Sequence, residues 1–192
     1  MSGASARRYA HADIRSALEV ETGGKCAYCE SRIDHVDFPN IEHIVPKSRF
    51  PDLVCDWGNL TLACTKCNIA KRDYYDAACM LVNPYTDDVN GHISFYGPMV
   101  FAITPDRGAT TITRVDLNRS GLLFKRTEVI QQVLRLRDQI QRAPAARRPL
   151  LEELRRLVSA RSEHAAAARR CVIDHWAEIV PEIIDVDDEW PA

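Results

Sequence analysis

The sequence CAYC at residues 26–29 has a counterpart in CTKC at residues 64–67, and together the two stretches set the expected fold. Each Cys-x-x-Cys turn presents two sulfurs from one tight loop, so two turns supply the four thiolates of a closed tetrahedral zinc site. Zinc would join the two turns and contribute its binding free energy to folding. A redox Cys-x-x-Cys is the competing interpretation, but two pairs without a thioredoxin-like βαβ pattern argue against it. The predicted zinc ligands are Cys26, Cys29, Cys64 and Cys67.

The 34 residues between the two turns must hold structure of their own, because this gap exceeds the usual spacing of a zinc ribbon. NIEHIVP at residues 40–46 predicts a strand that Pro46 stops, and NLTLA at residues 59–63 predicts a second strand. Neighbouring side chains of a strand point to opposite faces, so Glu42 and His43 diverge. A bulge, or the bend at Pro46, would be needed to aim both at one ligand.

The sequence after the second turn predicts a small antiparallel sheet and then long helices. HISFYG, MVFAIT and TTITRVDL, at residues 92–97, 99–104 and 110–117, are short and rich in β-branched or aromatic residues. From residue 118 the apolar residues recur at helical spacing, and APAARRP at residues 143–149 interrupts them. The two halves of this pattern predict a C-terminal helical hairpin, which completes an α+β fold.

Composition and charge limit the class of protein. The chain has 192 residues, of which 46% are hydrophobic and 27% charged, as in globular proteins. It has no apolar run long enough to cross a bilayer and no secretory signal at its start, so we expect a cytoplasmic protein with reduced cysteines. The net charge is −2, yet residues 119–170 hold thirteen Lys or Arg against five Asp or Glu. This local balance of +8 favours a polyanion or a protein partner, unless the arginines are simply solvated.

The ordered combination of CAYCE, IEHIVPKS and WGNLTLACTKCNIAKRD resembles the zinc-stapled form of the HNH endonuclease family, over about residues 24–75. That family grips one catalytic divalent ion in two strands and a helix, the ββα-metal unit. The resemblance implies that residues 1–80 form an HNH nuclease unit with an N-terminal helix and the four-cysteine zinc site. Residues 81–192 would then hold the small sheet, the helical hairpin and an acidic tail.

The resemblance implies roles for individual residues. His43 matches the general base, and Glu42 matches the acidic metal ligand before it. Asn59 matches the asparagine that braces the loop between the strands. Asn68, at the start of the helix, matches a second metal ligand, and Lys71 matches a helix lysine that meets phosphate. Glu42 stands where many members have Asp, and Asn68 where many have His, so the preferred metal is less certain than the site.

The implied activity is hydrolysis of phosphodiester bonds with Mg²⁺ or Mn²⁺ as the catalytic cofactor and Zn²⁺ as the structural one. DNA is the first choice of substrate, and RNA, including tRNA, is the alternative. The order GKCAYCE, IEHIVPKS, NPY and VDLNR also resembles the nuclease subunits of Septu-type and some retron anti-phage systems. Those subunits act with an SMC-like ATPase, which is therefore an implied partner. Two other readings stay open: a zinc-knuckle nucleic-acid-binding module without catalysis, and a scaffold whose helices recruit the ATPase.

Overall fold

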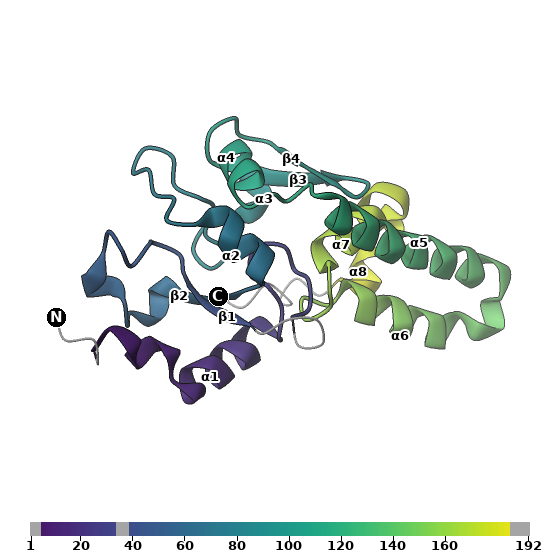
Figure 1. Cartoon of the computed structure of the whole chain (residues 1–192). Coiled ribbons are helices and arrows are strands. Elements are labelled where there is room, and N and C mark those ends of the chain that lie inside the picture. Colours follow the sequence, from purple (N-terminus) through teal and green to yellow (C-terminus); the bar gives the residue numbers. More distant parts are fainter. Residues whose placement is uncertain (1–4, 34–38, 185–192) are drawn as a thin grey trace.

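The computed structural model describes residues 5–33 and 39–184, and it confirms the predicted α+β class (Figure 1). Its centre is a two-stranded sheet followed by a helix: β1 (Asn40–His43), β2 (Leu60–Ala63) and α2 (Thr65–Lys71). The strands pair antiparallel and in regular register, from Asn40 opposite Ala63 to His43 opposite Leu60. The paired residues therefore contain no bulge, and β1 ends at His43 instead of reaching Pro46 as the sequence predicted.

The N-terminal helix, α1 (Ala12–Thr22), packs against β2 and closes one side of this unit. Leu18 is fully buried, whereas Val20 is exposed. Gly23 ends the helix in the left-handed conformation (φ 62°), which costs glycine little because it has no Cβ. Short 3₁₀ helices lie at the start of the chain and in the loop between the strands: η1 (Ser5–Ala10), η2 (Pro51–Leu53) and η3 (Trp57–Asn59).

A second antiparallel sheet pairs β3 (Ile93–Tyr96) with β4 (Met99–Ala102), between α3 (Val89–His92) and α4 (Arg107–Arg114). The prediction of a third strand at residues 110–117 is wrong, because α4 occupies most of that stretch. Thr111 and Val115 are four residues apart and both buried, which is the spacing of one helix face. The Thr111 hydroxyl donates to the carbonyl of Arg107 and accepts from the amide of Val82, both at 2.8 Å. A β-branched residue can thus satisfy its polar atom within the helix.

The C-terminal part is helical. It comprises α5 (Ser120–Arg142), η4 (Pro144–Ala146), α6 (Arg147–Val158), α7 (Ala165–His175), η5 (Ala177–Ile179) and α8 (Val180–Ile183). Helices α5 and α6 lie side by side and are joined at one end of the molecule, which confirms the predicted hairpin (Figure 1). The predicted second helix is not continuous, however, because residues 159–164 break it into α6 and α7.

Two hydrophobic clusters organise the packing. The first runs from Leu18 to Leu122 and combines Cys26, Cys29 and Cys67 with residues of the β1–β2 sheet and the β3–β4 sheet. The second runs from Val133 to Ile183 and fills the space among the C-terminal helices. The packing therefore changes between Leu122 and Val133. The division of the chain at residue 80 stays a prediction. No helix in the described ranges is long and apolar enough to cross a membrane.

The segment between α6 and α7 binds the first Cys-x-x-Cys turn. The ammonium of Lys25, a fully buried residue, donates to the carbonyl oxygen of Ser162 at 3.0 Å. The carboxylate of Glu30 accepts from the amide of Ala166 at 3.1 Å, and the carboxylate of Glu163 accepts from the amide of Arg32 at 3.0 Å. Charge-assisted hydrogen bonds of this kind hold the helical part against the first Cys-x-x-Cys turn.

Candidate active site and metal centre

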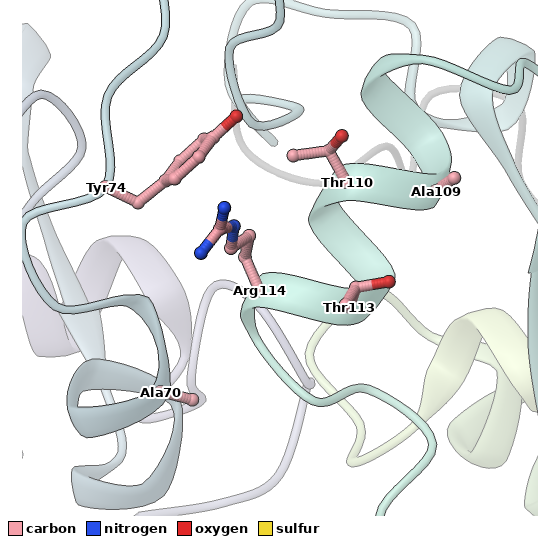
Figure 2. A pocket seen from close by; sticks show the side chains of 6 residues that line it. All are labelled: Ala70, Tyr74, Ala109, Thr110, Thr113 and Arg114. Atoms are coloured by element: carbon pink, nitrogen blue, oxygen red, sulfur yellow. The ribbon is translucent and has the colours of Figure 1, made fainter.

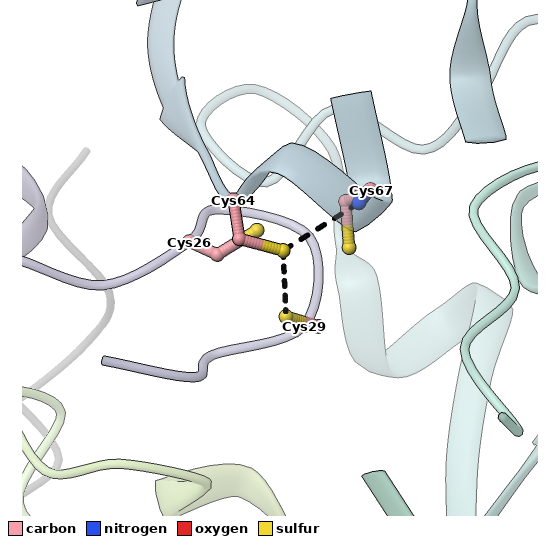
Figure 3. A group of neighbouring side chains, drawn as sticks. All are labelled: Cys26, Cys29, Cys64 and Cys67. Carbon is pink, nitrogen blue, oxygen red and sulfur yellow. Dashed lines mark hydrogen bonds between the residues drawn. The ribbon is translucent and has the colours of Figure 1, made fainter. Parts of the chain in front are cut away.

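Four cysteine sulfurs meet where the first Cys-x-x-Cys turn faces the N-terminus of α2 (Figure 3). All four Sγ atoms lie within 4.8 Å of one another, and those of Cys29 and Cys64 are 3.9 Å apart. Cys64 is half-buried and the other three are buried. Cys64 also caps α2, since its Sγ accepts a hydrogen bond from the amide of Cys67 at 3.5 Å. The structure thus brings together the four cysteines that the sequence predicted would cluster.

The donor set of this cluster fits zinc. Burial raises the pKa of Cys26, whereas the hydrogen bond with Cys26 lowers the pKa of Cys64 to about 7. Thiols this close together cannot all ionise unless a cation neutralises them. Four cysteine sulfurs able to surround one point are the ligand set of a structural zinc site. Within residues 5–33 and 39–184, no other set of three or more His, Cys, Asp and Glu side chains is close enough to hold a metal.

Glu42 and Lys71 form a buried ion pair that joins β1 to α2. The ammonium of Lys71 lies 2.7 Å from Oε1 of Glu42 and 2.8 Å from the carbonyl oxygen of His43. Lys71 is 1% exposed and Glu42 is 7% exposed, so neither side chain extends into solvent. Burial raises the pKa of Glu42, although the adjacent ammonium acts in the opposite direction. The structure therefore shows Lys71 binding a carboxylate; its contact with phosphate stays a prediction.

His43 is held at the end of β1 by contacts on two sides. Its Nε2 lies 3.1 Å from the carbonyl oxygen of Val54, which can only accept, so Nε2 carries the proton and Nδ1 keeps a lone pair. The ring of Tyr9 packs edge-on against the imidazole, with ring centroids 4.6 Å apart. Burial lowers the pKa of His43, and the positive charges of Lys47 and Lys71 act in the same direction. The histidine is therefore neutral near pH 7.

The two asparagines differ in how their side chains are engaged. The Asn59 side chain is buried and spans the loop that follows β1: its Oδ1 accepts from the amide of Val45 at 2.7 Å. Its Nδ2 donates to the carbonyls of Val45 and Leu53 at 3.1 and 3.2 Å. This geometry is that of a loop brace. Asn68 lies in the first turns of α2 and is half-buried, and its side-chain amide has no hydrogen-bond partner among the described residues. Its oxygen is therefore available to a ligand.

Tyr9 and Lys47 belong to the surroundings of His43, and the sequence motifs gave neither of them a definite role. The ammonium of Lys47 donates a hydrogen bond to the Tyr9 hydroxyl and lies 4.2 Å from the centroid of its ring. Tyr9 comes from η1, far from the motif in sequence, so no spacing rule could connect it with His43. Lys47 follows the motif directly, and its positive charge beside a histidine was the signal that could have marked it.

A cavity of about 490 Å³ opens on another side of α2 (Figure 2). It is lined by Ala70 of α2, by Tyr74, and by Ala109, Thr110, Thr113 and Arg114 of α4. The guanidinium of Arg114 lies over the Tyr74 ring, 4.4 Å from its centroid, and this contact occupies both side chains. Neither Glu42 nor His43 lines the cavity, so it is not part of the candidate active site.

Comparison with known proteins agrees with this geometry. Residues 26–73 match the model of the HNH endonuclease family, which confirms that resemblance. The chain is 31% identical over 129 residues to the Septu protein PtuB of Bacillus thuringiensis, covering 64% of this chain and 50% of that protein. It is 26% identical over 157 residues to the Septu protein PtuB of Bacillus mycoides strain KBAB4, covering 65% of this chain and 53% of that protein. The chain thus spans about half the length of these curated relatives.

Proposed function

We propose, from the match of residues 26–73 to the HNH endonuclease family, that the chain is a metal-dependent endonuclease that hydrolyses phosphodiester bonds. The observation that supports this most directly is that the adjacent residues Glu42 and His43, at the end of β1, are both buried and each held by a separate polar contact. Lys71 of α2 binds the glutamate, and the loop braced by Asn59 binds the histidine. Burying these polar groups costs stability. The proposed chemistry gives both buried polar groups a role.

In this proposal His43 is the general base. Its Nε2–H is fixed on the carbonyl of Val54, so Nδ1 is the atom that accepts a proton from the attacking water. Burial keeps the pKa of the ring below its usual value, so Nδ1 is free of a proton at neutral pH. Tyr9 packs against the imidazole and restricts its rotation, which keeps Nδ1 in one direction. Such positioning lowers the entropic cost of proton transfer.

Glu42 and Asn68 are the proposed ligands of one Mg²⁺ or Mn²⁺ ion. When bound, such an ion supplies positive charge to the phosphate and to the leaving oxygen. A carboxylate and an amide offer the oxygen atoms that these hard cations prefer, and two protein ligands leave positions for water and phosphate. Lys71 engages Oε1 of Glu42, which leaves Oε2 for the cation. We therefore assign Lys71 to holding the Glu42 carboxylate in place, in preference to binding phosphate.

For the substrate and the setting, we propose DNA cleavage in anti-phage defence. The similarity to two proteins named Septu protein PtuB supports the defence role. The ATPase partner of the SMC-like class that the sequence resemblance implies is part of this proposal. RNA is the alternative substrate, because a base and a metal acting on a phosphodiester neither require nor exclude a 2′-hydroxyl. Acting on phage nucleic acid would place the protein in the cytoplasm.

The test is cleavage of supercoiled plasmid and of total RNA by the purified chain with Mg²⁺ or Mn²⁺. His43→Ala should cleave at least about 10²-fold more slowly than the wild type. His175→Ala, which changes an exposed histidine on α7, should cut like the wild type. Equal cleavage by the His43 variant would refute the assignment. Binding of nucleic acid without cleavage under any of these conditions would favour the zinc-knuckle binding module.

A further inference from the structure

The stretch VDLNRSGLLFKR, residues 115–126, has no part in the proposed chemistry, yet it is densely hydrogen-bonded to its surroundings. The side-chain amide of Asn118 pairs with the backbone of Val100 in β4, accepting from its N–H at 2.8 Å and donating to its carbonyl at 2.7 Å. The guanidinium of Arg126 is 2% exposed and donates to the carbonyl of Leu117 at 2.8 Å. Both side chains donate to or accept from backbone groups, and among the described residues neither forms a hydrogen bond with a cysteine sulfur.

Arg119, the residue that precedes α5, is different because its guanidinium reaches the cysteine cluster. One terminal nitrogen, Nη2, lies 3.5 Å from Sγ of Cys67 and 3.8 Å from Sγ of Cys64. The other, Nη1, donates to the carbonyl oxygens of Asp116 and Val115 at 2.9 and 3.3 Å. The planar group is therefore held from one side by the backbone and presents its other side to two sulfurs.

We propose that Arg119 is a positioning residue of the zinc centre, donating hydrogen bonds from outside the ligand shell to the thiolates of Cys64 and Cys67. The inference rests on the proposed zinc site. Four thiolates around one Zn²⁺ carry a net charge of −2, and three of the four cysteines are buried, where unbalanced charge is costly. A guanidinium beside two sulfurs offsets part of that charge. Outer partners of this kind orient metal ligands and tune the metal.

The residue type agrees with this role. A guanidinium is planar and has donors pointing in different directions, so it can bind two carbonyls and two sulfurs at once. A lysine ammonium on a flexible stem could not keep both sets of contacts in fixed geometry. The contacts are also selective: they involve the two sulfurs of the second Cys-x-x-Cys turn. One of these, Cys64, is the half-buried member of the cluster and thus the ligand most open to attack.

The competing explanation is that Arg119 only caps the turn between α4 and α5 through its two carbonyl contacts. The two explanations differ in what they predict for the metal. A cap affects the melting temperature alone, whereas a donor to the thiolates also affects the electronic state and the reactivity of the sulfurs. Hydrogen bonds withdraw electron density from a thiolate, so their loss should make the sulfur more nucleophilic and its charge-transfer absorption lower in energy.

The experiment compares Arg119→Gln and Arg119→Lys with Arg135→Gln, which changes an exposed arginine on the same helix. Metal analysis of the wild type comes first: one zinc per chain supports the site, and zinc-free protein would refute the proposed zinc site itself. We then expect Arg119→Gln to bind zinc about 10–100-fold more weakly than wild type, the usual effect of losing an outer partner, and so to release zinc to a chelator faster. Arg135→Gln should release zinc at the wild-type rate.

Two further readouts separate the explanations. With Co²⁺ in place of zinc, the sulfur-to-cobalt charge-transfer band should move to longer wavelength in both Arg119 variants, and alkylation of the zinc-loaded protein should accelerate at Cys64. Arg119→Lys keeps the positive charge, so it provides these measurements if Arg119→Gln fails to fold. Zinc-loaded variants with wild-type release rates and an unmoved cobalt band would overturn the proposal, whatever their melting temperatures.

Discussion

Replacing Lys71 with methionine should destabilise the fold by about 3–5 kcal/mol, because it removes the cation of a buried ion pair and leaves the carboxylate behind. The Lys71 ammonium contacts Oε1 of Glu42 at 2.7 Å and the carbonyl of His43 at 2.8 Å, and no more than 7% of Glu42 is exposed. Methionine keeps most of the aliphatic stem, so the packing of α2 changes little. The measured loss of stability then reflects the removal of the positive charge and of its two hydrogen bonds.

The size of the effect can be converted into a melting temperature. For a chain of this length, 1 kcal/mol shifts the melting temperature by roughly 2–4 °C, so we expect a decrease of about 6–20 °C. The pH dependence has a definite sign. Burial already raises the pKa of Glu42, and loss of Lys71 raises it further, since the ammonium acts to lower it. A raised folded-state pKa gives stability at low pH that is lost as pH rises. The difference in the free energy of unfolding between the wild type and the Lys71 variant should therefore increase from acidic to alkaline pH.

The assay is thermal and urea unfolding of the zinc-loaded variant, with Lys66→Met, an exposed lysine of the same helix, as the matched control. A double variant, Glu42→Gln with Lys71→Met, should recover much of the loss. Mn²⁺ should also reduce the loss of stability of Lys71→Met if Glu42 is a metal ligand, because the cation replaces the missing positive charge. A Lys71 variant that melts like the wild type would refute the reasoning. If it also bound nucleic acid more weakly, the original phosphate-binding role of Lys71 would return.

Other substitutions test the remaining roles. His43→Ala should lower the cleavage rate about 10²–10⁴-fold, as measured on plasmid, and the loss of a general base explains this range. Cys67→Ser should leave the protein without zinc by metal analysis and unfold the nuclease unit, since it forfeits much of the ~10–16 kcal/mol of apparent binding free energy. Asn68→Ala should raise the Mg²⁺ concentration needed for half-maximal cleavage while circular dichroism stays unchanged; an unaltered metal requirement would make Asn68 structural only. Burial lowers the pKa of His164, so on acidification the unfolded chain takes up a proton at this residue before the folded chain does, and the fold loses stability below about pH 6.5. His164→Asn should therefore lose less stability than the wild type over this pH range. Urea melts from pH 5 to 8, with His175→Asn as control, measure the difference.

The part of the chain that matches the HNH family was the part of the fold that the sequence predicted best. Each Cys-x-x-Cys turn fixes its own local geometry, and a four-thiolate zinc site would require the two turns to meet. The cysteine spacing therefore predicted a contact between segments that lie far apart in the sequence. The small sheet was harder. Residues 110–117 are rich in β-branched residues and read as a strand, but Thr111 and Val115 bury one helix face against the rest of the fold. Tertiary packing outweighed intrinsic preference there, which propensity alone cannot anticipate.

For the site, the sequence could name the residues but not their partners. The motif assigned Lys71 to the substrate, whereas its ammonium is committed to Glu42, and that contact spans 29 residues. It also assigned His43 a role as general base without indicating that the residue is only 4% exposed and packed against Tyr9. Each of these contacts depends on how separate segments meet. His43→Ala should therefore also lower the melting temperature, and a conservative His43→Gln variant is the better measure of chemistry alone.

The electrostatic field of the C-terminal helices extends less far than their number of arginines suggests. Many of their arginines are already paired with neighbouring carboxylates: Arg142 with Asp138, Arg147 with Glu182, Arg148 with Glu152, Arg156 with Glu153, and Arg170 with Asp174. Paired, exposed charges contribute little field beyond about 10 Å at physiological salt. Asp138, Glu152 and Glu153 are among the five acids already counted in the balance of +8, so an excess of positive charge remains and both functions considered for this region stay open. Arg119, at the start of α5, joins the helical part to the four-cysteine cluster. A partner bound to the helices would then act on a body that is joined to the metal centre by direct contact.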